Sequence, residues 1–436
     1  MANTCKYYKQ RRYVSYNSGA TWQPLNEYRK GELYEYDSSD CGYYTMYQWV
    51  SVSGEYICDG TTKYQKEKKQ VSTDGGQTWS DVTPLETRKG FVIEFESSDC
   101  HDYSNDYLTF VALESGTFKF NCSSANTEIQ YSLDYGNTWS TLANGVDSPT
   151  ITAGNKIMWK GELIPYRQSD GLGIGTFSST GGFDVEGNIM SLLYGDNFSG
   201  QTSLSGKDYA FYGLFSNCNN LINAENLSLP ATTLTTECYD AMFLGCSSLR
   251  TAPQLPATTL VDRCYQGMFY ECTSLTAAPQ LPATNLSGAD WCYAYMFNGC
   301  TSLTSAPQLP ATTLAQSCYY SMFGGCSGLT SAPILSATTL AQACYYSMFR
   351  DCTSLTSAPM LPATTLAKNC YVGMFLRCSS LNSITCLATD ISANQCTYIW
   401  VKGVASNGTF TKASSMNDWT SGVDGIPNNW TVQNYS

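Results

Sequence analysis

The sequence predicts a mainly β protein, in which small N-terminal β modules and a β-sandwich precede a solenoid of repeats with short helical turns. Three observations support this prediction. Cysteines recur at a fixed period over about two fifths of the chain. Ahead of them, the motif Ser-x-Asp/Asn-x-Gly-x-Thr-Trp occurs three times, and such residues favour tight turns. The segments around these motifs alternate apolar with polar residues, and this two-residue period is typical of half-buried strands.

Composition narrows the class of protein. With 436 residues, of which 43% are hydrophobic, the chain is long enough for about two to four folded domains. Its formal net charge of −12 argues against nucleic acid as a partner, because phosphate binding requires clustered lysine and arginine. The same charge disfavours an anionic membrane surface, and no run of about 18 apolar residues is present to insert into a bilayer.

Residues 1–56 and 57–102 are predicted to form two similar small β modules. Each contains a turn motif, then Arg-Lys-Gly at 29–31 or 88–90, and then an acidic segment that ends in Cys41 or Cys100. Modules of this size bury little core by themselves. We therefore expect them to contact each other or neighbouring subunits, which favours a homo-oligomer.

Three further segments surround the repeats. Residues 103–170 contain short alternating runs with Gly and Asn turns and predict a β-sandwich. Residues 171–209 are rich in Gly and Ser, include an apolar patch at 189–194, and are predicted to cap the N-terminal end of the solenoid. Residues 392–436 are predicted to cap its other end with Trp400, Trp419 and Trp430, because an open end of a repeat array would expose core.

The repeats themselves occupy residues 210–391, and their step is 26 residues except for one of 28. A fixed period of this length predicts a solenoid, in which each unit buries its apolar edge against its neighbours. Two cysteine columns mark the period. The first is Cys238, Cys264, Cys292, Cys318, Cys344 and Cys370, and the second is Cys246, Cys272, Cys300, Cys326, Cys352 and Cys378.

The column cysteines are predicted to be small buried apolar residues. The chain has one histidine, His101, which lies outside the array, and Cys-x-x-Cys does not occur, so the spacing predicts no zinc site. Disulfides within a column remain the alternative. They are less favoured because disulfides are rare in proteins made in a cytoplasm.

Each unit has three parts. The segment Cys-Tyr-x-x-Met-Phe-x-x-Cys predicts a short helix or turn with Cys, Met and Phe near one face. Leu-Thr-Ser-Ala-Pro predicts a short strand closed by proline, and Leu-Pro-Ala-Thr-Thr-Leu predicts an extended segment. Strands from successive units would then stack into a parallel sheet.

The array resembles the BspA-type leucine-rich repeat of bacterial surface proteins. The resemblance lies in Met-Phe-x-Gly-Cys-Thr-Ser-Leu-Thr-Ser, as at residues 296–305, and extends over the registered copies. It implies a leucine-rich-repeat solenoid that is used for binding. The chain departs from the commonest form by carrying Ala-Pro-x-Leu-Pro in place of alternating isoleucines, so we expect a shorter and flatter strand.

No residue is predicted to be catalytic, to bind a cofactor or to bind a metal. The motif at residues 15–22, 72–79 and 132–139 resembles the Asp-box of sialidases and other propellers, in which it is a structural hairpin. A glycosidase would need two positioned carboxylates, and nothing else resembles a sialidase site. His101 and Asp102 are adjacent, which places their side chains poorly for a catalytic pair in an extended segment.

Two columns of the array are candidates for ligand contact. The tyrosine that follows each first-column cysteine is expected to form a buried stack, because its hydroxyl lies at an edge where partners are available. The variable position in Ala-Pro-x-Leu-Pro is the candidate ligand-facing column, because variation within a rigid repeat is typical of a binding surface. Its members are Gln254, Gln280, Gln308, Ile334 and Met360.

A second resemblance concerns the N-terminal pair. Residues 6–41 and 63–100 are similar to modules in structural proteins of crAss-like phages and in proteins of their Bacteroidales hosts. The resemblance implies a virion protein made in the host cytoplasm, joined to other virion proteins through residues 1–102. The first residues lack the apolar core of a secretory signal, in agreement with that origin.

The sequence as a whole therefore predicts a non-enzymatic phage virion fibre or decoration protein that binds a host-surface glycan or protein. The alternative is a BspA-type adhesin on a bacterial cell surface, and a third, weaker reading is an Asp-box carbohydrate-active enzyme.

Overall fold

The protein forms two compact units in the computed structural model, residues 1–102 and 103–436. The structure describes residues 6–14, 23–35, 46–59, 62–72, 79–81, 87–94, 103–122, 126, 128–168 and 171–435. Strands and turns dominate both units, which confirms the predicted mainly β class. Within the described ranges, no helix has both the length and the hydrophobicity required to span a bilayer.

The described residues of the first unit form two antiparallel sheets. One is a hairpin of β1 (Lys6–Val14) and β2 (Gln23–Glu35). In the other, β4 (Thr62–Ser72) is the common partner of β3 (Met46–Asp59), β5 (Ser80–Asp81) and β6 (Thr87–Glu94). The predicted boundary between residues 56 and 57 falls inside β3. β3 thus crosses the predicted boundary, because it continues through residue 57 as the ladder partner of β4.

The second unit begins with a six-stranded sheet. Its strand order is β10 (Ser140–Ala143), β9 (Glu128–Ser132), β11 (Lys156–Lys160), β7 (Leu108–Ala112), β15 (Phe183–Asn188) and β16 (Leu221–Ser228). Two small sheets accompany it, β8 (Phe118–Cys122) with β14 (Gly175–Ser179) and β12 (Tyr166–Gln168) with β13 (Gly171–Gly173). The helical elements here are short: η2 (Tyr103–Asn105), α1 (Ser191–Tyr194) and η3 (Gly195–Asn197).

An aromatic core joins this region to the repeats. Phe110 of β7 is fully buried, and its ring centroid lies 4.9 Å from that of Phe177 in β14 and 5.9 Å from that of Phe215 in the first repeat. β15 pairs with β7 on one side and, in parallel, with β16 on the other. The predicted boundaries at 170 and 209 therefore separate no bodies, because the segments predicted as a β-sandwich, as the N-terminal cap of the solenoid and as the first repeat share one sheet and one core.

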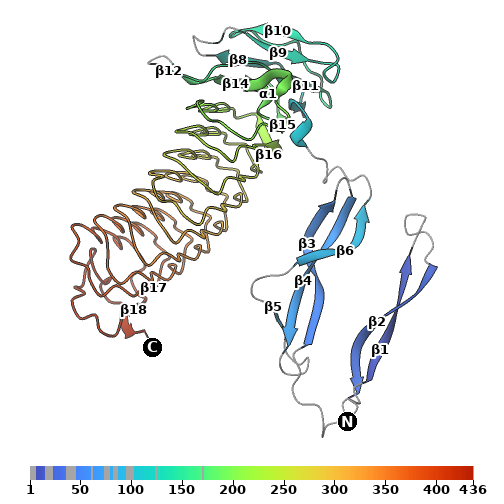
Figure 1. Cartoon of the computed structure of the whole chain (residues 1–436). Coiled ribbons are helices and arrows are strands. Elements are labelled where there is room, and N and C mark those ends of the chain that lie inside the picture. Colours follow the sequence, from blue (N-terminus) through green and yellow to red (C-terminus); the bar gives the residue numbers. More distant parts are fainter. Residues whose placement is uncertain are drawn as a thin grey trace. The chain divides into compact units, whose positions relative to one another are not determined.

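Beyond β16 the repeats form coils that stack one on the next, seen in Figure 1 between β16 and β17. The segment Cys-Tyr-x-x-Met-Phe-x-x-Cys is a series of turns without a helix. Along this segment, successive N–H groups alternate between an acceptor in the same coil and one in the next coil. Met296 N–H donates to Tyr293 O in its own coil (3.3 Å), and Phe297 N–H donates to Met322 O in the next (2.9 Å). Of the two predicted forms, helix or turn, the turn is the one that occurs.

A left-handed backbone recurs every four residues in these turns. In one coil it is found at Ser317, Ser321 and Gly325, with φ of 53°, 48° and 73°. An L-residue with a side chain pays roughly 1–2 kcal/mol for this conformation. The bonds between neighbouring coils hold it in place, because reversing φ would turn N–H groups away from the next coil.

The predicted parallel sheet is reduced to isolated bridges between coils, such as Ser305 with Ser331 and Leu309 with Leu335. The prolines of Ala-Pro and Leu-Pro explain why the bridges do not extend into a sheet, because proline lacks the N–H that a continuous ladder requires. Where these prolines are missing, strands do form. β17 (Ser383–Cys386) pairs in parallel with β18 (Thr409–Lys412), and β18 pairs with β19 (Thr431–Asn434).

Stacked rings fill the inside of the coils. The tyrosine column is buried, as predicted, and its successive rings are nearly parallel, as for Tyr319 and Tyr345 at 5.8 Å. A phenylalanine column runs beside it, as for Phe297 and Phe323 at 5.7 Å. At the C-terminal end Trp400 stacks on the last tyrosine at 6.2 Å and on Trp419 at 5.5 Å. Trp430 is also buried and donates its indole N–H to Ala405 O.

Candidate functional site

The third copy of the turn motif closes the hairpin between β9 and β10. The Asp134 carboxylate accepts hydrogen bonds from the Ser132 hydroxyl (2.7 Å), the Thr138 hydroxyl (2.6 Å) and the Thr138 N–H (2.8 Å). Trp139 donates its indole N–H to Gly136 O at 3.1 Å. The first copy, most of the second and His101 lie outside the described residues.

These bonds decide the chemistry of Asp134. They stabilise its charged form and lower the pKa of the carboxyl to about 2, with the Thr138 hydroxyl as the largest cause. A carboxylate with so low a pKa is a weak base and is not available as a proton donor near neutral pH. Asp134 therefore acts as the acceptor that holds its own turn.

Trp139 lies in a polar cluster beside this hairpin. The Lys160 ammonium is 4.2 Å from the Trp139 ring centroid and 2.6 Å from the Asp196 carboxylate. The Tyr107 hydroxyl donates to the same carboxylate at 2.7 Å, and the Tyr107 ring lies 4.8 Å from Trp139. Lys160 is buried but paired, so the cluster is a satisfied packing unit that fixes the indole.

Both cysteine columns are fully buried, and their residues are free thiols. In the second column each thiol also donates to the carbonyl of a phenylalanine of an earlier coil, for example Cys300 to Phe269 O (3.1 Å) and Cys352 to Phe323 O (3.0 Å). Burial raises the pKa of Cys300 well above its ordinary value, so the reactive thiolate is suppressed. Among the described residues, no three His, Cys, Asp or Glu side chains are grouped as metal ligands would be.

The predicted ligand-facing column lies on the surface. All five members, Gln254, Gln280, Gln308, Ile334 and Met360, are exposed. The leucine that directly follows each of these five residues is buried. Each coil thus exposes the side chain at this position, and the bridge between Leu309 and Leu335 keeps two such positions in register. Ile334 is 69% exposed, an unusual position for an isoleucine.

Two buried carboxyl residues, Glu237 and Asp240, lie at the N-terminal end of the array. Asp240 is only 5% exposed, and burial together with the nearby Glu237 raises its pKa to about 8. Glu237 is paired with Arg263 at 3.1 Å, and the charge of Arg263 partly offsets the shift of Asp240. Asp240 occupies the position two residues after the first cysteine of its coil.

Sequence reasoning missed a groove on the turns of the middle coils, which we call the tyrosine groove. Half-buried rings from successive coils line it: Tyr295 and Tyr320 have centroids 5.2 Å apart, and Tyr320 and Tyr346 stack at 4.5 Å. Its volume is about 450 Å³, within the usual range of ligand pockets. The signal in the sequence was the set of variable positions two, three and six residues after the first cysteine, where tyrosine recurs.

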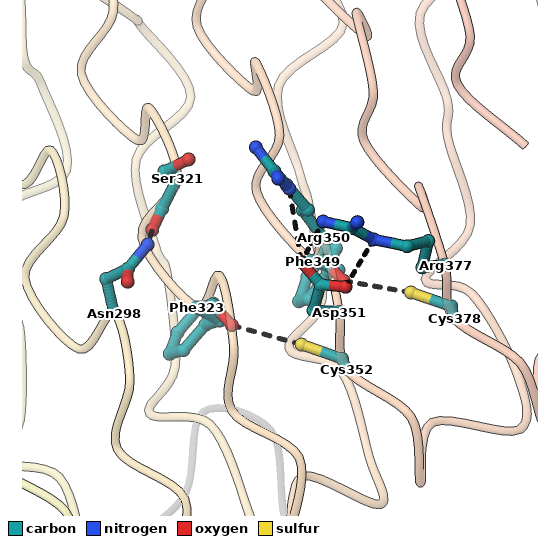
Figure 2. A network of polar contacts seen from close by, with 9 residues as sticks. All are labelled: Asn298, Ser321, Phe323, Phe349, Arg350, Asp351, Cys352, Arg377 and Cys378. Carbon is teal, nitrogen blue, oxygen red and sulfur yellow. Dashed lines mark hydrogen bonds and ion pairs between the residues drawn. The ribbon is translucent and has the colours of Figure 1, made fainter. Parts of the chain in front are cut away.

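An ionic cluster lies at the groove, and two of its residues, Arg350 and Asp351, belong to the groove lining (Figure 2). Asp351 accepts from Arg377 through both carboxylate oxygens, at 2.7 Å and 2.9 Å, and from Arg350 Nε at 3.1 Å. Nearer the tyrosines, the Asn298 amide donates to Ser321 O at 3.2 Å. The groove therefore offers aromatic surface, hydroxyls and the guanidinium group of Arg350, which are suited to binding a polar ligand.

Comparisons of the chain with protein-family models, with curated proteins and with solved structures find no match.

Proposed function

We propose that this chain is a non-enzymatic phage virion fibre or decoration protein whose repeats form a leucine-rich-repeat solenoid that binds a host-surface glycan or protein. One observation carries the proposal. Constant side chains are packed inside the coils, while the residue ahead of the buried leucine is exposed in each coil and varies, from Gln254 to Met360. Such an arrangement suits recognition, because surface residues can change without loss of core packing.

Two features favour binding over catalysis. The uncharged polar row of Gln254, Gln280 and Gln308 can form hydrogen bonds to a glycan or a flat protein surface without the cost of burying ions. Asp134, the described aspartate of the Asp-box motif, is bonded within its own hairpin. A glycosidase requires a second positioned carboxylate with a different pKa.

The proposal assigns attachment to residues 1–102, through other virion proteins and copies of the same chain. It rests on the resemblance of these residues to modules of crAss-like phage structural proteins, and on their small size. Deleting 1–102 is expected to abolish incorporation into particles while residues 103–436 keep the fold, because these residues form a separate compact unit.

The BspA-type adhesin of a bacterial cell surface is the second candidate, favoured by the repeat motif at residues 296–305. Mass spectrometry separates the two. The chain is expected in purified phage particles under the first proposal. Its presence in a bacterial outer-surface fraction without phage would instead favour the adhesin.

The binding face is tested with matched charge changes. Gln280→Glu with Gln308→Glu places two negative charges on the proposed face in adjacent coils. Gln316→Glu with Gln342→Glu adds the same charge at two exposed positions elsewhere in the array. We expect the first pair to weaken binding of the purified protein to host cells while the second pair and both melting temperatures stay unchanged. Equal binding by both pairs would show that this column is not the binding face.

A further inference from the structure

We propose that the tyrosine groove is a separate binding site for an acidic saccharide, with the ligand carboxylate at Arg350 and the sugar rings along the tyrosines. The inference goes beyond the proposed function, since it assigns a second face of the array and a ligand class. It also applies to the purified chain, whether or not that chain belongs to a virion.

The aromatic wall is confined to a few coils. Tyr270, Tyr295, Tyr320 and Tyr346 follow one another along the groove, each in its own coil, and the Trp291 ring lies 5.0 Å from Tyr320. Burial, with a smaller effect of the neighbouring Tyr295 and Tyr346, raises the pKa of the Tyr320 hydroxyl. These rings are half-buried, so each presents an apolar edge beside a neutral hydroxyl. Tyrosine of this kind contacts the C–H and O–H groups of a sugar together.

Two glycines beside this wall leave room for polar side chains of the lining. Gly324 takes the place that Arg350 has in the next coil, six residues after the first cysteine. A Cβ on Gly324 would lie 2.5 Å from Asn298 Nδ2, and a Cβ on Gly373 would lie 3.0 Å from Ser347 Oγ. Side chains at these two positions would therefore occupy the groove or displace its polar lining.

The charged cluster supplies a counter-ion for one anion. Arg377 binds Asp351 through two nitrogens, and this fork satisfies the carboxylate. Arg350 contacts the same carboxylate through Nε and is 47% exposed in its side chain. Two guanidiniums against one carboxylate leave one net positive charge, in a chain whose formal net charge is −12. A single carboxylate on a ligand would neutralise that excess.

This combination selects an acidic saccharide among polar ligands. A nucleic acid would require several cations along the groove, whereas the cluster has an excess of one. A neutral saccharide would leave the excess charge without a partner. A saccharide with one carboxylate near the end that contacts the cluster matches both the hydroxyl-bearing wall and the charge.

Isothermal titration of the purified full chain tests the site with two acidic probes, tetragalacturonate and 3′-sialyllactose. Their neutral counterparts are methyl-esterified tetragalacturonate and lactose. At least one acidic probe is expected to bind more tightly than its counterpart. Arg350→Gln should weaken that binding by about tenfold or more, because a hydrogen bond to a charged group is lost. Tyr346→Ala should weaken it as well.

Arg263→Gln is the matched control, because it also removes one partly exposed arginine that is paired to an acid of the array, outside the groove. Binding should be unchanged in this variant, and melting temperatures separate loss of the site from loss of fold. Absence of charge-dependent binding by both acidic probes would overturn the inference, as would an equal loss in Arg350→Gln and Arg263→Gln. Host-cell binding through the Gln280 and Gln308 face is scored separately, so either proposal can fail without the other.

Discussion

Replacing Cys300 by serine is expected to destabilise the protein although the two side chains differ by one atom. Cys300 is fully buried, and its thiol donates to Phe269 O at 3.1 Å. That carbonyl already accepts the Cys272 N–H at 3.1 Å, so it does not depend on the thiol. The cost therefore arises from the new hydroxyl, which must leave water.

The magnitude follows from geometry. The shorter C–O bond holds the serine oxygen farther from Phe269 O than the sulfur, beyond the roughly 2.5–3.0 Å of a good O–H···O bond. An incompletely bonded buried hydroxyl costs about 1–3 kcal/mol. Cys300→Ala should cost roughly 1 kcal/mol or more, since it loses the packing of the sulfur and leaves a small cavity.

Urea denaturation of the full chain, followed by tryptophan fluorescence, measures the free energy of unfolding. Thr304→Ser, at an exposed position of the same coil, serves as the control and should change it by less than about 0.5 kcal/mol. If Cys300→Ser is as stable as the wild type, the column is not the dry packed core described above. Counting thiols on the unfolded chain completes the test, because a minority of reactive thiols would indicate column disulfides instead.

Three other outcomes are expected. The pKa of Asp134 is lowered to about 2, so its contribution to stability is present above its unfolded pKa of about 4 and is lost as pH falls toward 2. Asp134→Asn should therefore flatten the acid limb of a stability–pH profile. The effect of Asp240 on stability has the opposite pH dependence: its folded pKa is about 8, so stability falls as pH rises from about 4 to 8. Asp240→Asn should therefore stabilise the protein more at pH 8 than at pH 5, and equal gains at both pH values would contradict the assignment. Gly187→Ala should lower the melting temperature far more than Gly154→Ala, because both glycines have φ above 80° but only a Cβ on Gly187 would meet a backbone carbonyl, that of Tyr107. Similar losses in the two variants would mean that φ strain alone determines the cost of the alanine.

The candidate sites were only partly accessible to sequence reasoning. The exposed column from Gln254 to Met360 was predictable, because this position varies between residues that recur from unit to unit. The tyrosine groove was not, because its residues stand at different positions of their units: Tyr295 three residues after the cysteine, Tyr320 two, and Arg350 six. A search within one column cannot find them.

The sequence by itself determined the period, the buried columns and the mainly β class, because a residue that recurs every 26 positions packs against its own copy in the next coil. Tertiary structure decided the rest. The stacking of coils selected left-handed turns over a helix, as at Ser317 and Ser321. It also joined β15 to β16 across the predicted boundary, since the aromatic core around Phe110 is completed only by both segments. These outcomes depend on contacts between distant residues, and local patterns do not encode such contacts.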